Sequence, residues 1–148
     1  MHSHTLGNIL SVGRCCRVYR ARALEDTALR PAQQMLLSLV CRRPGLAQEE
    51  LITGLHLDKT TVAHQLTKLE EEGYIRREIP AEDGRCRLVY PTEKASAVYP
   101  RIHEAFEGFT AAILAGLDES EQAELERLTE HLRRNALALL EPEGGKEA

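Results

Sequence analysis

The sequence contains no tryptophan, and aromatic residues make up only 4% of its 148 residues. This scarcity argues against an aromatic platform on which the bases of single-stranded nucleic acid would stack. No apolar run approaches the length needed to cross a bilayer. The N-terminal stretch MHSHTLGNILSVGRCC lacks the charged start and the long apolar centre of a secretory signal. We therefore expect a cytoplasmic protein without membrane contacts.

The sequence also lacks the residue groupings that metal sites and enzymes need. Its four cysteines form no CxxC motif and no repeated spacing, which argues against a structural zinc site and a disulfide framework. Free cysteines are generally buried as small hydrophobes, and we expect the same here, with thiol sensing as the alternative. The sequence shows no paired carboxylates in a plausible cleft, no Ser/His/Asp set in a recognisable context and no glycine-rich phosphate loop. We predict that the protein is not an enzyme and holds no metal or cofactor.

Charge is distributed unevenly along the chain. The formal net charge is −4, which by itself does not indicate a nucleic-acid binder. Residues 1–44 nevertheless carry seven arginines against two acidic residues, whereas 45–91 carry six basic and nine acidic residues and 92–148 carry six basic and twelve acidic residues. Any contact with DNA must therefore come from the local placement of cations rather than from the overall field.

Apolar periodicity predicts a mainly helical chain. Helices are expected over 5–25 and 32–43, the second with Pro31 at its first position. A short helix of about two turns is expected within 46–57. Asp58 is a suitable N-cap for the helix that comes after it.

A hairpin and two long helices are expected next. Alternating residues predict strands over 74–79 and 85–90, joined by the turn sequence PAEDG. A helix is then expected over 93–116, where Pro100 should bend it or split off its first turn. The last helix, over 116–140, begins with a D-x-x-E capping box. No internal repeat or separate linker is evident, so we expect the parts to share one body.

The segment DKTTVAHQLTK at 58–68 has two contrasting faces if it is helical. Its apolar stripe has the spacing of a core-facing side and consists of Val62, Leu66 and Leu69. The opposite stripe is polar but carries no carboxylate, and it consists of Thr61, His64, Gln65 and Lys68. A solvated helix face more often carries Glu and Lys laid out as ion pairs. The composition of this stripe instead suits contact with bases and phosphates.

Two helices joined by a tight connection and followed by a basic hairpin are typical of a winged helix-turn-helix, whose second helix fits the DNA major groove. Hydroxyls near the start of that helix suit phosphates, and the imidazole and amide one turn further suit base edges. The DNA-contacting residues predicted on this helix are Lys59, Thr60, Thr61, His64, Gln65 and Lys68. The basic flank of the hairpin consists of Arg76, Arg77, Arg85 and Arg87.

The stretch LDKTTVAHQLTKLEEEGYIRRE, followed by EDGRCRLVYPTEKA, resembles the MarR family of bacterial and archaeal transcription regulators, and the resemblance covers the core at 29–95. It implies that the helix in this stretch is the recognition helix. It also implies that Asp83 steadies the wing and that Arg85 enters the minor groove, where a narrow A·T-rich segment attracts arginine. The sequence departs from the family pattern at Arg30, where threonine commonly caps a helix, and at Ala95, where glycine is usual. Neither position belongs to the DNA-facing set, which on the hairpin comprises Arg76, Asp83, Arg85 and Arg87.

The terminal helices carry more apolar residues than a small winged helix needs to cover. These residues are Leu6, Ile9, Leu10, Ile113, Leu114, Leu125, Leu128, Leu132, Leu137, Leu139 and Leu140. A single recognition helix reads too few base pairs to be selective, and two copies one DNA turn apart supply the missing discrimination. We therefore predict a homodimer, with a helical dimerisation region over 1–30 and 93–148 and a DNA-binding domain over 31–92. A monomer is the alternative.

The resemblance further implies regulation by a small-molecule effector or an oxidant, bound between the dimer arms and the DNA-binding lobes. The candidate effector-binding residues are Arg14, Cys15, Tyr19, Met35 and Leu39. Cys15 and Cys16 also lie beside arginines, and nearby cations favour thiolate. Oxidant sensing by these two thiols is therefore a second hypothesis for the signal.

The sequence thus predicts a mainly α fold with a small β-hairpin wing, in which a winged helix-turn-helix core is flanked by N- and C-terminal dimerisation helices. The predicted function is that of a transcriptional regulator, acting as a homodimeric repressor that binds a palindromic operator in double-stranded DNA and is released by the signal. The alternative is a winged helix used only for protein contacts, with DNA binding lost.

Overall fold

A computed structural model describes residues 2–55 and 57–141. The chain divides into two compact units, one up to Phe109 and one from Thr110 onward. The elements, in chain order, are α1 (His2–Ala23), the 3₁₀ turn η1 (Glu25–Thr27), α2 (Pro31–Arg42), β1 (Leu46–Ala47), α3 (Gln48–Leu55), α4 (Lys59–Glu71), β2 (Ile75–Glu78), β3 (Leu88–Pro91), α5 (Glu93–Leu114) and α6 (Glu119–Ala138). Within the described residues, no helix is both long and apolar enough to span a membrane.

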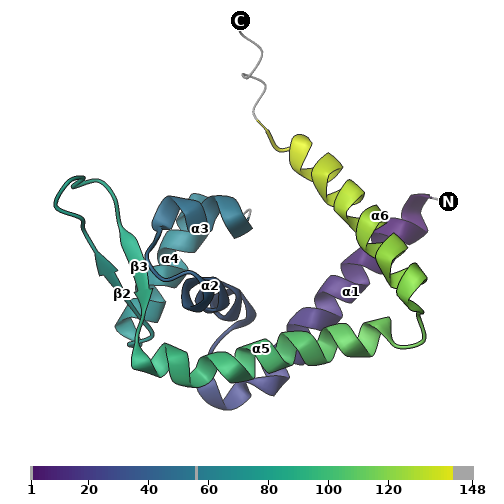
Figure 1. Cartoon of the computed structure of the whole chain (residues 1–148), viewed down its shortest axis with the longest axis horizontal. Helices are drawn as coiled ribbons and strands as arrows, with labels where there is room; N and C mark the ends of the chain where they lie inside the picture. The colour runs from purple at the N-terminus through teal and green to yellow at the C-terminus, as the bar shows by residue number, and fades with distance from the viewer. Residues whose placement is uncertain (1, 56, 142–148) are drawn as a thin grey trace, which may run out of the picture. The chain divides into compact units, whose positions relative to one another are not determined.

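The first unit contains a small antiparallel sheet in the order β1-β3-β2. Val89 of β3 pairs with Leu46 on one side and with Arg77 on the other. Figure 1 shows the hairpin of β2 and β3 projecting away from α2, α3 and α4. The mainly α fold with a β wing is therefore confirmed. Strand β1 was not predicted, because two residues are too few to show alternation.

The predicted strand over 85–90 is wrong at its start, since β3 begins at Leu88. The backbone before it is engaged in a turn: the amide of Arg85 donates to Asp83 Oδ1 at 3.0 Å, and the amide of Cys86 donates to the carbonyl of Asp83 at 3.2 Å. These amides cannot also donate to a neighbouring strand. The arginines at 85 and 87 therefore lie in the loop of the wing rather than on its strand.

The helix boundaries agree with the predicted caps. Pro31 is the first residue of α2, and the carboxylate of Asp58 accepts a hydrogen bond from the amide of Thr61 at 3.0 Å. At Arg30, where a threonine cap is missing, the Gln33 Oε1 atom accepts the Arg30 amide at 3.0 Å instead. Helix α5 continues through Pro100 as one element, so the predicted split is not observed.

A hydrophobic core joins the helices of the first unit to the sheet. Its fully buried side chains include Leu36, Leu37, Val40, Leu51, Val62, Leu66, Leu69, Val89 and Ile102. Members come from α2, α3, α4, β3 and α5, so each of these elements contributes an apolar face. Burial of this kind is the main favourable term in folding. The core therefore fixes which side of α4 remains available to solvent.

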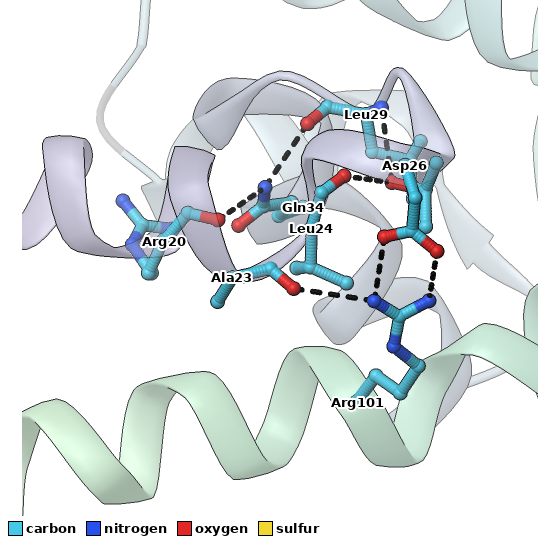
Figure 2. Close-up of polar contacts among 8 residues, drawn as sticks. Arg20, Ala23, Leu24, Asp26, Leu29, Gln34 and Arg101 are labelled. Carbon is cyan, nitrogen blue, oxygen red and sulfur yellow. Dashed lines mark hydrogen bonds and ion pairs between the residues drawn. The ribbon is translucent and has the colours of Figure 1, made fainter.

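A cluster of polar contacts fastens the end of α1 to α2 and α5 (Figure 2). Gln34 is fully buried, and its Nε2 donates to the carbonyls of Leu29 at 3.0 Å and Arg20 at 3.3 Å. Arg101 on α5 donates to both carboxylate oxygens of Asp26, at 2.7 and 2.9 Å. This hydrogen bonding holds the pKa of the Asp26 carboxyl below its usual value.

The second unit contains an amphipathic helix, α6. The predicted capping box is confirmed, because the carboxylates of Asp118 and Glu121 each accept the other residue's amide at 2.9 Å. One side of α6 carries the ion pair of Arg127 with Glu124 and the ion pairs that Glu130 makes with two arginines. The large hydrophobic residues exposed on α6 are Leu125, Leu128 and Leu132, with exposed fractions of 39%, 45% and 42%.

Candidate nucleic-acid interface

Helix α4 presents the two faces that its sequence predicts. Val62, Leu66 and Leu69 are fully buried in the core. The polar stripe lies on the other side, where Lys59, Thr60 and His64 are exposed and Thr61, Gln65 and Lys68 are half-buried. None of these six residues is fully buried by the rest of the described chain. The face is therefore available to a partner.

Of the two threonines in the first turn of α4, only Thr61 takes part in the N-cap. The amide of Thr61 donates a hydrogen bond to Asp58 Oδ1, and the hydroxyl of Thr61 donates a second one to Asp58 Oδ2. The exposed Thr60 hydroxyl makes no side-chain hydrogen bond within the described residues. A hydroxyl has a single proton to donate. Thr60 is therefore better placed than Thr61 to donate to a phosphate.

Gln65 combines partial exposure with an unused acceptor. Its Oε1 atom is buried, yet none of the residues that the structure describes donates a hydrogen bond to it. Buried polar atoms are normally hydrogen-bonded. The Gln65 Oε1 atom is therefore not committed to a partner in the described chain, and a change of side-chain rotamer would bring it to a group approaching α4, such as the edge of a base.

The two arginines of the wing loop differ in their hydrogen bonding. Arg87 turns back on the loop, where its Nη1 donates to the carbonyls of Gly84 and Cys86, both at 3.2 Å. The guanidinium of Arg85 is exposed and makes no hydrogen bond or ion pair in the described part of the chain. The Asp83 carboxylate fixes the backbone of this turn through the Arg85 amide. The loop thus presents one free guanidinium on an ordered turn.

The third predicted wing arginine lies against the sheet. Arg76 pairs with Glu78, and its guanidinium stacks over the Tyr90 ring at 4.5 Å from the centroid. The ion pair partly neutralises its charge. Arg76 is therefore more constrained than Arg85, although its side chain is still 55% exposed.

A cleft of about 420 Å³ lies between the wing loop and the helix pair. Three cationic residues, Lys59, Arg85 and Arg87, line it together with Asp83 and residues of α3. The start of α4 and the tip of the wing, which are far apart in the sequence, therefore bring their predicted DNA-contacting cations to one place.

The predicted effector-binding residues are distributed over α1 and α2. Arg14 and Cys15 are exposed on α1, and neither makes a side-chain hydrogen bond or ion pair with described residues. Tyr19 packs its ring against Phe109 of α5, with centroids 5.5 Å apart. Met35 is half-buried on α2, and Leu39 is half-buried against the core.

The cysteines correct one expectation. Cys15 is exposed, whereas Cys16, Cys41 and Cys86 are half-buried, so none is enclosed in the core as predicted. Cys15 and Cys16 lie on α1, which exposes most of its surface, whereas Cys41 packs against the core and Cys86 lies in the loop between β2 and β3. Partial burial raises the pKa of the Cys41 thiol. In the described residues, no group of three His, Cys, Asp or Glu side chains is placed to hold a metal ion.

The helix pair, the three-stranded sheet and the arginine-bearing loop define a winged helix-turn-helix protein. The model of the MarR family matches residues 29–87. The uncharacterized HTH-type transcriptional regulator YybA of Bacillus subtilis (strain 168) is 30% identical over 111 residues, which cover 75% of this chain and 74% of YybA. The chain therefore belongs to the MarR family of transcriptional regulators. This membership agrees with the prediction that the protein is not an enzyme.

Solved structures support the same assignment. The crystal structure of the transcriptional regulator SlyA matches with a TM-score of 0.86 and 30% identity, covering 89% of this chain and 93% of SlyA. A putative MarR family transcriptional regulator from Listeria monocytogenes, solved in complex with 26mer DNA, matches with a TM-score of 0.87 and 26% identity, covering 97% of both chains.

Proposed function

We propose that the protein binds operator DNA through α4 and the wing, and represses transcription as a homodimer until a signal releases it. The observation that carries this proposal is the uncovered polar face of α4 beside the free guanidinium of Arg85. The relative from Listeria monocytogenes that was solved with 26mer DNA supports it. The residues assigned to DNA binding, directly or through the turn of the wing, are Lys59, Thr60, Thr61, His64, Gln65, Lys68, Arg76, Asp83, Arg85 and Arg87.

In this proposal α4 lies in the major groove and the wing reaches the adjacent minor groove. His64 and Gln65 read base edges, while Lys59, Lys68 and the hydroxyl of Thr60 contact the phosphate backbone. Arg85 enters the minor groove, where the negative potential of a narrow groove attracts it. Asp83 acts through the backbone of the turn rather than by touching DNA.

The homodimer rests on apolar surface that the single chain leaves uncovered. Exposed hydrophobic residues of the first unit include Leu6, Ile9, Leu10 and Val12 on α1, and those of the second include Leu125, Leu128 and Leu132 on α6. Exposed apolar surface of this kind marks association sites. We assign 1–30 and 93–148 to the dimerisation region and 31–92 to the DNA-binding domain. Replacing Leu128 with Glu should convert the dimer to a monomer in light scattering, and a dimer of unchanged stability would contradict this assignment.

The signal is assigned to the region of Arg14, Cys15, Tyr19, Met35 and Leu39. An effector can bind more tightly to a dimer whose recognition helices are wrongly spaced for DNA than to the DNA-binding dimer. The DNA affinity then falls by the ratio of the effector's affinities for these two states. Cys15 is the most exposed thiol of the four, which keeps oxidant sensing open as the second form of the signal.

Selection from random duplex DNA, followed by titration of the selected duplex at several salt concentrations, tests the proposal. We expect a palindromic site and an association constant that falls linearly with salt on logarithmic axes. Light scattering of the same sample should give the mass of a dimer. The acidic net charge of −4 favours the alternative of a protein-contact module. The absence of any salt-sensitive binding would support that alternative.

A further inference from the structure

Arg77, the second arginine of the wing strand, is directed toward α4. Strand β2 lies at the edge of the sheet, so on one of its sides the described part of the chain places no neighbouring strand. There the Glu70 carboxylate accepts three hydrogen bonds from Arg77: from the amide at 3.2 Å, from Nε at 3.3 Å and from Nη2 at 3.1 Å. Glu70 therefore binds both the backbone and the side chain of the edge strand.

The same guanidinium connects two further residues. Its Nη1 donates to Gln48 Oε1 and its Nη2 to Thr67 Oγ1, both at 3.4 Å. Gln48 is the first residue of α3, and Thr67 precedes Glu70 by one turn of α4. The side chain of Arg77 is only 21% exposed, compared with 55% for neighbouring Arg76. Arg77 thus joins both helices of the helix pair to the wing.

We propose that Arg77 is a positioning residue for DNA recognition, which, together with Glu70, fixes the orientation of α4 relative to the wing. The proposal rests on the proposed function, because this orientation matters for binding only if α4 and the wing contact neighbouring grooves. Arg77 itself makes no DNA contact in this account.

The physical argument is the difference between directional and non-directional contacts. The buried side chains Val62, Leu66 and Leu69 attach α4 to the core, but hydrophobic burial is non-directional. A bidentate arginine–carboxylate pair is directional, because both hydrogen bonds form only in a narrow range of relative orientations. The core decides which side of α4 faces solvent, and the pair adds a directional link between the C-terminal end of α4 and β2, which fixes how α4 and its residues His64 and Gln65 lie relative to the wing.

The pair also explains a carboxylate in an unfavourable place. Glu70 lies at the C-terminal end of α4, where the helix dipole disfavours negative charge, and it adds negative charge to a helix that we assign to DNA. Hydrogen bonding to Arg77 lowers the pKa of Glu70 and keeps it ionised. Its role in holding Arg77 accounts for this charge.

Glu70→Gln tests the proposal, because two explanations predict opposite signs. If Glu70 only repels phosphate, its neutralisation should tighten binding. If it positions α4, binding of a duplex selected by the parent protein should weaken about tenfold, as the loss of a hydrogen bond to a charged group would give. Binding of a scrambled duplex of the same length should stay nearly constant, since phosphate contacts dominate it. Glu71→Gln is the matched control, because Glu71 is exposed and makes no side-chain hydrogen bond with described residues.

Hydrogen exchange at the Arg77 amide supplies a readout without DNA. This amide should exchange faster in Glu70→Gln than in the parent or in Glu71→Gln, while the melting temperature shows that the variant is folded. Unchanged exchange, or equal or tighter binding of the selected duplex, would overturn the proposal. If the parent binds no duplex in a salt-sensitive manner, the proposed function fails and the positioning role fails with it. Faster exchange alone would then mark the pair as merely structural.

Discussion

Replacing Arg85 with alanine should weaken operator binding without unfolding the wing. The exposed guanidinium makes no hydrogen bond or ion pair with described residues, so its removal takes away none of the polar contacts among them. The hydrogen bond that orders the turn runs from the Arg85 backbone amide to Asp83 and is retained in the alanine variant. The whole effect should therefore appear in DNA affinity.

The expected size of the effect is that of one good groove contact, roughly 1–3 kcal/mol. This corresponds to a loss of roughly 5- to 150-fold in affinity at 25 °C, since 1.4 kcal/mol is tenfold. The slope of log K against log salt should become shallower by no more than about one, because a single cation is removed. A preference for A·T-rich sequence beside the major-groove site should decrease as well.

A fluorescence anisotropy titration with the selected duplex at fixed salt measures this loss. Arg22→Ala is the matched control, because Arg22 lies at the exposed end of α1 and has no side-chain hydrogen bond or ion pair in the described chain. It removes the same charge outside the predicted DNA-facing set. Parent-like affinity of Arg85→Ala, or an equal loss in both variants, would refute the reasoning.

Three further predictions concern the core, the pH dependence and the thiols. Leu66→Ala removes a fully buried side chain and should lower the free energy of unfolding by about 2–5 kcal/mol in a denaturant titration; a loss below about 1 kcal/mol would contradict the packing described. Because Arg77 lowers the pKa of Glu70 below its ordinary 4.5, the pair should stabilise the protein at neutral pH and lose this contribution as the pH falls through the folded-state pKa. In Glu70→Gln the melting temperature should then fall less steeply as the pH is lowered, and an unchanged pH dependence of the melting temperature would argue against the pair. If Cys15 and Cys16 sense oxidants, their double serine variant should keep DNA after peroxide treatment while the parent releases it; equal release would exclude these thiols.

The local features of the fold were open to prediction from sequence. The apolar spacing of Val62, Leu66 and Leu69 identifies the buried side of α4, and Asp58 marks its beginning, because both signals depend on residues within one helix. Strand β1 depends instead on pairing between Leu46 and Val89, which lie far apart in the sequence, and the start of β3 depends on the turn in which Asp83 accepts the amides of Arg85 and Cys86. Two residues carry no periodicity from which such a pairing can be inferred.

The sequence predicts which residues make up the candidate site, but it does not predict which of the arginines are engaged in hydrogen bonds within the chain. Arg85 and Arg87 are the same residue type two positions apart, yet one is free and the other donates to the carbonyls of its own loop. The course of the loop backbone decides this difference. Glu70 and Arg77 are likewise visible as charges in the sequence, but their pairing depends on how the chain turns between α4 and β2.

The central claim is that the exposed face of α4 and the loop of Arg85 contact adjacent grooves of one duplex, once in each half of a dimer. Hydroxyl-radical and methylation footprinting of the selected duplex, bound by the parent protein, tests it most directly. The account predicts two protected major-groove segments centred one helical turn, about 10 base pairs, or a multiple of it apart. Each should be flanked by minor-groove protection that disappears in Arg85→Ala. Protection of a single segment, or minor-groove protection that persists without Arg85, would contradict the account.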